Sequence, residues 1–112
     1  VFLPLFSGFG PEPLRVRLSD SEARVVITAD GGPRRGVASP MKSILDEVLA
    51  DCPSVTDVFV VRRLGDAVEC PMLKGRDHWW HDLVPVQSDD CLAEPMESED
   101  RLFVLYTSGS TG

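Results

Sequence analysis

The chain has 112 residues, the length of about one small domain, and 11 basic against 18 acidic side chains give a net charge of −7 with histidine neutral. This charge disfavours a nucleic-acid-binding protein, which needs a basic face, and it disfavours an electrostatic membrane anchor. A hydrophobic content of 43% with 26% charged residues is typical of a globular protein, and the apolar run at the start of the chain is too short to span a membrane.

The first predicted elements alternate between strand and helix. The apolar run from Val1 to Phe6 predicts a strand, and two leucines one turn apart predict a short helix over Glu12 to Asp20. The run from Val25 to Thr28 predicts a second strand, and the glycine-rich stretch Gly31 to Gly36 predicts a loop. These runs do not alternate with polar residues, which is typical of strands covered on both faces of a parallel sheet.

The clearest helical pattern follows this loop. From Met41 to Leu49, apolar residues recur at i, i+3, i+4, i+7 and i+8 and therefore share one face of a helix. Ser39 is a candidate N-cap, Pro40 suits the first helical position, and the Cys-Pro pair at 52 and 53 ends the pattern. The run from Val58 to Val61 then predicts a third strand.

The remaining elements complete an alternating order. Asp77 to Val84 predicts a third helix, Gln87 to Asp100 predicts a solvated acidic loop, and Leu102 to Tyr106 predicts a fourth strand. This order predicts the α/β class, as a partial layered fold with mostly parallel strands and right-handed crossover helices.

The cysteines and histidines predict no metal or catalytic site. Cys52, Cys70 and Cys91 are odd in number and far apart, which argues against a disulfide framework or a zinc site and fits a reducing cytoplasm. His78 and His81 lack a third nearby ligand, so we expect them to pack with the adjacent tryptophans rather than to bind a metal.

The most informative segment follows the fourth predicted strand and consists of Thr107, Ser108, Gly109, Ser110, Thr111 and Gly112. Glycines let backbone N–H groups converge on one point and the hydroxyls add donors, so such a loop can hold a polyphosphate. It is neither a Walker A loop nor a Gly-x-Gly-x-x-Gly loop. A flexible linker is the alternative, but the carboxyl end of a buried strand is where open α/β sheets bind ligands.

The segment Tyr106 to Gly112 after its Leu-Phe-Val-Leu strand resembles the phosphate-loop signature of the AMP-forming adenylating enzymes. Residues Leu5 to Glu12, Val25 to Gly32 and Gly75 to Leu83 resemble the acetyl-CoA and propionyl-CoA synthetase branch, in the same order and at similar spacing. The resemblance covers nearly the whole chain. It implies a fragment, residues 1–112, of the large N-terminal AMP-binding domain, ending inside the phosphate-binding loop.

The resemblance also implies the chemistry of the parent enzyme. A short-chain carboxylate, acetate or propionate, would attack the α-phosphate of ATP with Mg²⁺ present, and coenzyme A would capture the acyl-adenylate. Residues Thr107 to Gly112 would hold the outer phosphates of ATP, whereas the family's catalytic residues would lie beyond Gly112. The alternatives are a longer-chain acyl-CoA synthetase, another adenylation domain, or a small non-catalytic α/β module.

Two adjacent arginines, Arg34 and Arg35, stand out in this acidic chain because glycine and proline confine them to a tight loop. A solvated turn is the simplest interpretation. In the branch that the chain resembles, this loop supplies arginines to the 3′-phosphate of coenzyme A, and Arg34 falls on the first of them. Val37 occupies the second position, so the resemblance implies a contact that is weaker or shared with Arg35.

Overall fold

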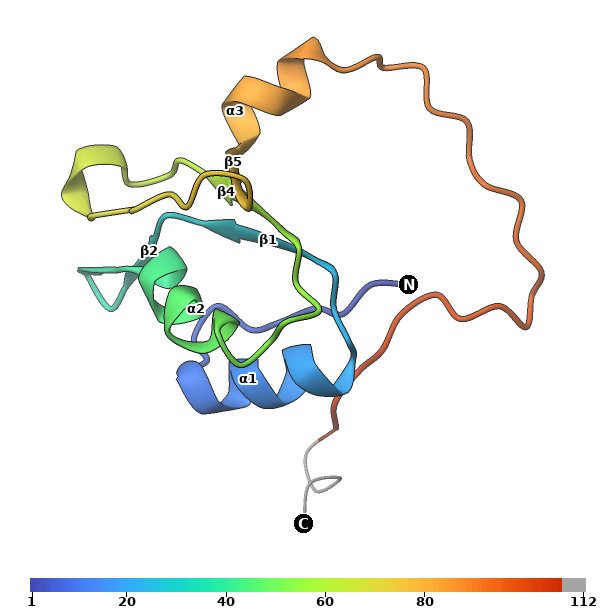
Figure 1. Cartoon of the computed structure of the whole chain (residues 1–112), viewed down its shortest axis with the longest axis horizontal. Helices are drawn as coiled ribbons and strands as arrows, with labels where there is room; N and C mark the ends of the chain where they lie inside the picture. The colour runs from blue at the N-terminus through green and yellow to red at the C-terminus, as the bar shows by residue number, and fades with distance from the viewer. Residues whose placement is uncertain (108–112) are drawn as a thin grey trace.

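A parallel three-stranded sheet lies at the centre of the computed structural model, which describes residues 1–107 (Figure 1). Its strands are β1 (Val25–Ala29), β4 (Asp57–Val61) and β5 (Asp77–Trp79), in the order β1-β4-β5. In register, Val25 pairs with Asp57 and Val58 pairs with Asp77. The prediction of an α/β fold with parallel strands is confirmed.

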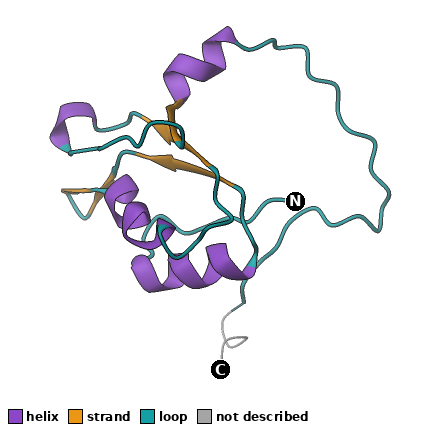
Figure 2. Ribbon diagram, viewed as in Figure 1, coloured by secondary structure: helices purple, strands orange, loops and turns teal. Residues whose placement is uncertain are grey.

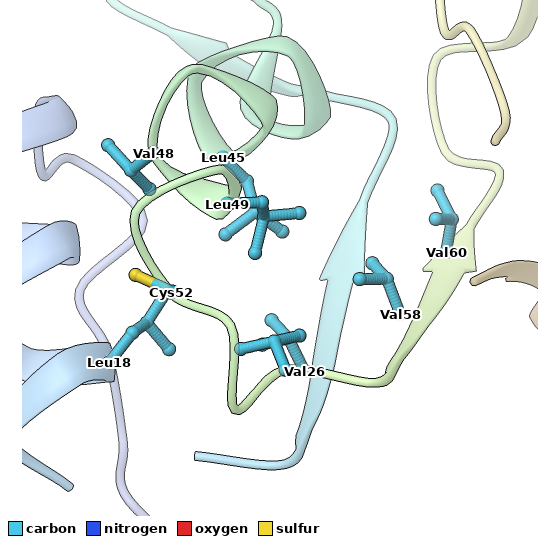
Figure 3. Close-up of a cluster of buried hydrophobic side chains, with 9 residues drawn as sticks. Leu18, Val26, Leu45, Val48, Leu49, Cys52, Val58 and Val60 are labelled. Carbon is cyan, nitrogen blue, oxygen red and sulfur yellow. The ribbon is translucent and has the colours of Figure 1, made fainter. Parts of the chain in front are cut away.

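Two helices, α1 (Pro11–Asp20) and α2 (Met41–Leu49), pack against each other on one side of β1 (Figure 2). Both helices were predicted from their apolar spacing, and α2 contains every apolar position of its pattern. Their inward side chains meet the inward side chains of β1 and β4 in a single core (Figure 3). The core consists of Leu18, Val26, Leu45, Val48, Leu49, Cys52, Val55, Val58 and Val60.

The two faces of the sheet differ in burial. Val58 and Val60 are 0% exposed on the helical side, whereas Val25 and Ile27 are 52% and 63% exposed. The alternation of side chains along a strand sends these neighbours to opposite faces. Within residues 1–107, one face of the sheet is therefore buried against the helices and the other is partly exposed.

The predicted loop at 31–36 is mostly a hairpin of β2 (Gly32–Arg34) and β3 (Val37–Ser39). Arg35 has a φ of 50° and Gly36 a φ of 79°, and these left-handed conformations reverse the chain between the two short strands. Ser39 pairs with Gly32 in this hairpin, and Pro40 takes the N-cap position of α2 without a side-chain hydrogen bond. The predicted N-cap at Ser39 is wrong by one residue.

The third predicted helix is also corrected. Its first residues form β5, and only Trp80–Leu83 is helical, as α3. A short 3₁₀ turn, η2 (Val84–Val86), follows α3, and another, η1 (Gly65–Ala67), lies between β4 and β5. The backbone of Asp77–Trp79 pairs with the edge of β4, and this long-range pairing overrides the local helical pattern.

The strands predicted at both ends of the chain reduce to one parallel bridge between Phe2 and Phe103. The amide of Phe2 donates to the Leu102 carbonyl at 3.2 Å, and the amide of Val104 donates to the Phe2 carbonyl at 3.0 Å. The acidic segment before it is irregular and exposed, as predicted, and runs in a wide arc from η2 back to α1 (Figure 1). No helix in residues 1–107 is long and apolar enough to cross a membrane.

Candidate functional site

The predicted arginines lie at the tip of the β2–β3 hairpin, next to the N-terminal segment. Arg34 and Arg35 are both exposed, and Nη1 of Arg34 donates to the carbonyl oxygen of Gly8 at 2.9 Å. A Cβ atom at position 8 would lie 2.6 Å from Cε1 of Phe6 and 2.9 Å from Nη1 of Arg34. A side chain at position 8 would therefore displace the guanidinium of Arg34 or the ring of Phe6, so glycine favours the contact between the hairpin tip and residues 6–9.

A buried carboxylate positions the base of this hairpin. Asp30 follows β1 directly, is 1% exposed, and accepts hydrogen bonds of 2.7–3.1 Å from the backbone N–H groups of four residues. These donors are Gly31, Arg63, Leu64 and Gly65. Because three of the donors follow β4, Asp30 ties the carboxyl ends of two neighbouring parallel strands together.

The charge of Asp30 is compatible with its burial. Burial by itself raises the pKa of this carboxyl group, but the hydrogen bonds from the backbone N–H groups of Arg63, Leu64, Gly65 and Gly31 outweigh it and hold the pKa below its ordinary value. Next to it, a Cβ atom on Gly31 would lie only 2.5 Å from the Ser39 carbonyl oxygen, so the two ends of the hairpin meet closely there. The carboxylate and the glycine together determine where the hairpin leaves the sheet.

A second buried network joins α2 to β5. Lys42 is 0% exposed, and its Nζ atom lies 2.7 Å from Oδ2 of Asp46 and 2.8 Å from Oδ2 of Asp77. Arg76 donates to both carboxylates, at 2.7 Å to Asp46 and at 2.6 Å to Asp77. Two cations thus neutralise two anions, which is the condition under which charges are tolerated in a protein interior.

The pKa of Asp77 in this network predicts an acid-sensitive contribution to stability. Burial raises this pKa, but hydrogen bonds from Arg76 and Lys42 lower it more strongly, to about 2 from the ordinary value of 3.8. A carboxyl group with a depressed pKa in the folded state stabilises the fold above its unfolded pKa, and this stabilisation, about 2 kcal/mol, is lost as the pH falls from about 4 to about 2.

Urea denaturation of the wild type and the Asp77→Asn variant tests this expectation. We expect the variant to be less stable at neutral pH and the difference between the two proteins to shrink by about 2 kcal/mol at about pH 2. The variant Asp89→Asn, which changes an exposed carboxylate of the acidic segment, is the matched control. A difference between wild type and Asp77→Asn that does not change with pH would contradict the role of the Asp77 charge.

Of the predicted phosphate loop, only Thr107 belongs to the described residues. Ser108, Gly109, Ser110, Thr111 and Gly112 lie outside the described residues. Thr107 is exposed and follows Tyr106, whose hydroxyl donates to the carboxylate of Asp20 at the end of α1. This hydrogen bond raises the pKa of Tyr106 and fixes the chain at the entrance of the loop.

The two histidines do not come together. His78 in β5 lies 3.0 Å from Oδ1 of Asp57 and stacks on Phe59, whereas His81 in α3 lies beside Trp79. Within residues 1–107, no group of three or more His, Cys, Asp or Glu side chains is arranged to hold a metal ion. The two histidines therefore have separate partners, and His81 also lies 3.5 Å from Oδ1 of Asp82.

The cavities do not coincide with the predicted residues. An apolar cavity of about 80 Å³ lies between residues 5–9, β1 and α2, which is well below the ~300 Å³ of a small ligand pocket. An open hollow of about 460 Å³ lies where β1 and β4 begin, and Arg24, Asp51 and Cys52 are among the residues that line it. Arg34 and Arg35 line neither of these two cavities and are exposed at the hairpin tip.

The residues of the two buried networks, Asp30, Lys42 and Asp46, were not singled out from the sequence, although each lies in a recognisable pattern. Lys42 and Asp46 are spaced i, i+4, and Lys42 falls on the same helical face as Leu45 and Leu49. A cation on an apolar face indicates a buried partner, but the sequence does not show that Asp77 supplies it. Asp30 stands at the carboxyl end of a predicted strand before two glycines, which indicates a backbone-capping carboxylate.

Comparison with known proteins identifies the class of the chain. The AMP-binding enzyme family matches residues 1–112, and the chain belongs to that family. The chain is 51% identical over 108 residues to the acetyl-coenzyme A synthetase of Rubrobacter xylanophilus, covering 96% of the chain and 16% of that protein. Identity is 52% to acetyl-coenzyme A synthetase 2 of Pseudomonas putida and 50% to the acetyl-coenzyme A synthetase of Methanothrix thermoacetophila, with the same coverage. The predicted family is confirmed, and the chain spans 16% of the length of these curated relatives.

Proposed function

We propose that the protein is an AMP-forming acyl-CoA ligase that activates acetate or propionate, and that residues 1–112 belong to its N-terminal AMP-binding domain. The observation that carries this proposal is the 51% identity over 96% of the chain to a protein named acetyl-coenzyme A synthetase. The contact of Arg34 with the Gly8 carbonyl supports it, because it joins the segment Leu5 to Glu12 to the arginine loop, and both resemble the acetyl-CoA and propionyl-CoA synthetase branch. A cytoplasmic location fits the three free cysteines.

The proposed reaction has two steps. A carboxylate oxygen of the acid attacks the α-phosphorus of ATP, and the bond from this phosphorus to the bridging oxygen breaks as pyrophosphate leaves. The thiol sulfur of coenzyme A then attacks the acyl carbon and releases its proton to solvent, and the bond from this carbon to the phosphate oxygen breaks as AMP leaves. Mg²⁺ would accompany ATP and screen its phosphates, and residues 1–107 contribute no group of three or more metal ligands for it.

The proposed binding roles follow the electrostatics of each segment. Residues Thr107 to Gly112 hold the outer phosphates of ATP through backbone N–H groups and hydroxyls, and such donors become more valuable as pyrophosphate gains charge in the transition state. Arg34 binds a phosphate group of coenzyme A, because its planar guanidinium retains donors beyond the one that contacts Gly8. Arg35 at the adjacent position of the turn adds positive charge.

The proposed role of Arg34 predicts a selective loss. We expect Arg34→Ala to raise the KM for coenzyme A about tenfold, since a hydrogen bond to a charged group contributes about 1.5 kcal/mol, and Arg35→Ala to raise it less. The measurement is thioester formation from acetate, ATP and coenzyme A by the protein expressed from its complete coding sequence.

The control for this experiment is Arg101→Ala, which removes an exposed arginine from the end of the acidic segment. Arg101→Ala should leave the KM for coenzyme A unchanged. Equal effects of Arg34→Ala and Arg101→Ala would contradict the binding role of Arg34. Absence of thioester formation by the wild type with acetate and with propionate would contradict the proposed function.

A further inference from the structure

We propose that Arg17 is a positioning residue that joins the segment carrying Gly8 to the segment entering the phosphate loop, an inference that rests on the proposed function. The guanidinium carbon of Arg17 lies 4.6 Å from the centroid of the Phe9 ring and 4.7 Å from the centroid of the Tyr106 ring. Its Nη1 atom also donates to the Pro13 carbonyl oxygen at 3.1 Å. The side chain is thus held along α1 while its cation contacts aromatic rings from both ends of the chain.

The contacts on the Tyr106 side fix the entrance of the loop. A guanidinium over an aromatic ring is attracted by the negative face of the ring. The hydroxyl of the same tyrosine donates to Asp20, one turn further along α1. Tyr106 is therefore held at its ring and at its hydroxyl by a single helix, and Thr107 follows it directly. In Figure 1 this end of the chain passes beside the carboxyl end of α1.

The contacts on the Phe9 side lead to the candidate coenzyme A site. Phe9 is adjacent to Gly8, whose carbonyl oxygen accepts the hydrogen bond from Arg34. The amide of Phe9 donates to the Phe6 carbonyl at 3.0 Å, and the two rings lie 5.8 Å apart, edge to face. This turn links the position of Phe9 to that of its neighbour Gly8.

The same two segments also touch at their other ends. Phe2 and Phe103 form the parallel bridge, with ring centroids 5.7 Å apart. The bridge aligns the segments at one end, and Arg17 aligns them at the other. The position of Thr107 relative to Arg34 therefore depends on Arg17, although Arg17 itself lies outside both proposed binding segments.

This arrangement predicts that loss of Arg17 impairs the use of ATP and coenzyme A together. A residue that only stabilised α1 would lower the amount of active enzyme, and hence kcat, without changing either KM. We expect Arg17→Ala to raise the KM for ATP and the KM for coenzyme A about fivefold each, which is the ratio that corresponds to about 1 kcal/mol. Arg17→Lys should restore both values to within about twofold, because an ammonium group retains the attraction to the rings.

The experiment uses the protein expressed from its complete coding sequence. The KM for ATP is measured by acetate-dependent pyrophosphate exchange, and the KM for coenzyme A by thioester formation. The matched control is Arg15→Ala on the same helix, since Arg15 pairs with Glu12 and lies 3.6 Å from Asp51. A rise in only one KM, or equal effects of Arg15→Ala and Arg17→Ala, would overturn the proposal.

Deuterium uptake provides a readout that does not depend on activity. In Arg17→Ala, uptake should rise in peptides covering residues 2–9 and 101–107 together and stay unchanged in β1 and β4. Uptake that rises in only one of these peptides, or in neither, would overturn the joining role of Arg17. If the wild type lacks exchange with both acetate and propionate, the proposed function fails, and the uptake pattern alone then decides whether Arg17 joins the two segments.

Discussion

Replacing Lys42 by methionine is expected to lower the free energy of unfolding by about 4 kcal/mol. The ammonium group of Lys42 is fully buried and lies within 2.8 Å of carboxylate oxygens of Asp46 and Asp77. Methionine has a similar length but no charge, so the substitution leaves the buried carboxylate of Asp77 with Arg76 as its remaining cationic partner among these residues. Urea denaturation followed by tryptophan fluorescence measures the change.

Two further variants test whether the loss of stability arises from the buried charge network. Lys74→Met changes an exposed lysine and should leave the free energy of unfolding within about 0.5 kcal/mol of the wild-type value. The double variant Lys42→Met with Asp77→Leu should recover much of the stability, because it removes the buried carboxylate that has lost one of its two cationic partners. A Lys42→Met protein as stable as Lys74→Met would show that the network does not contribute.

Replacing Asp30 by alanine is expected to lower the free energy of unfolding by about 3 kcal/mol. The substitution leaves the backbone N–H groups of Gly31, Arg63, Leu64 and Gly65 without the carboxylate that accepts their hydrogen bonds. Asp30→Asn should lower the free energy of unfolding by less, because its amide oxygen can still accept hydrogen bonds from the donors that face Oδ1. Urea denaturation gives the size of the loss.

Amide exchange then localises the effect of Asp30→Ala. Exchange at the amides of Arg63, Leu64 and Gly65 should become faster, since their hydrogen bonds are lost. The control Asp66→Ala changes an exposed carboxylate in η1, next to the same loop, and should leave both stability and exchange unchanged. Wild-type exchange rates at these amides in Asp30→Ala would contradict the role assigned to this carboxylate.

The elements predicted correctly are those determined by short-range patterns. The apolar face of α2 and the apolar runs of β1 and β4 can be recognised from neighbouring residues in the sequence. The structure confirms all three elements. β5 was missed because it exists through pairing with β4 and through the contact of Asp77 with Lys42 from a distant part of the chain. The strands expected at the two ends of the chain likewise depend on neighbouring strands, and the described residues form only one bridge there.

The candidate site also combines residues that local patterns predict with contacts that they do not predict. Arg34 and Arg35 were found from sequence because two arginines between glycine and proline residues are locally conspicuous, and the structure places both at a hairpin tip. The contact of Arg34 with Gly8 and the stacking of Arg17 between Phe9 and Tyr106 join parts of the chain that are remote in sequence. No local pattern encodes such contacts, so they required the folded structure.

The measurement that tests the central claim most directly is carboxylate-dependent exchange between ATP and pyrophosphate, because this exchange reports adenylate formation before coenzyme A takes part. The protein expressed from its complete coding sequence should catalyse exchange with acetate or propionate, more slowly with butyrate, and at background level without a carboxylate or with amino acids. Exchange that requires an amino acid or a long-chain acid, or no exchange with any carboxylate, would contradict the assignment of this protein as a short-chain acyl-CoA ligase.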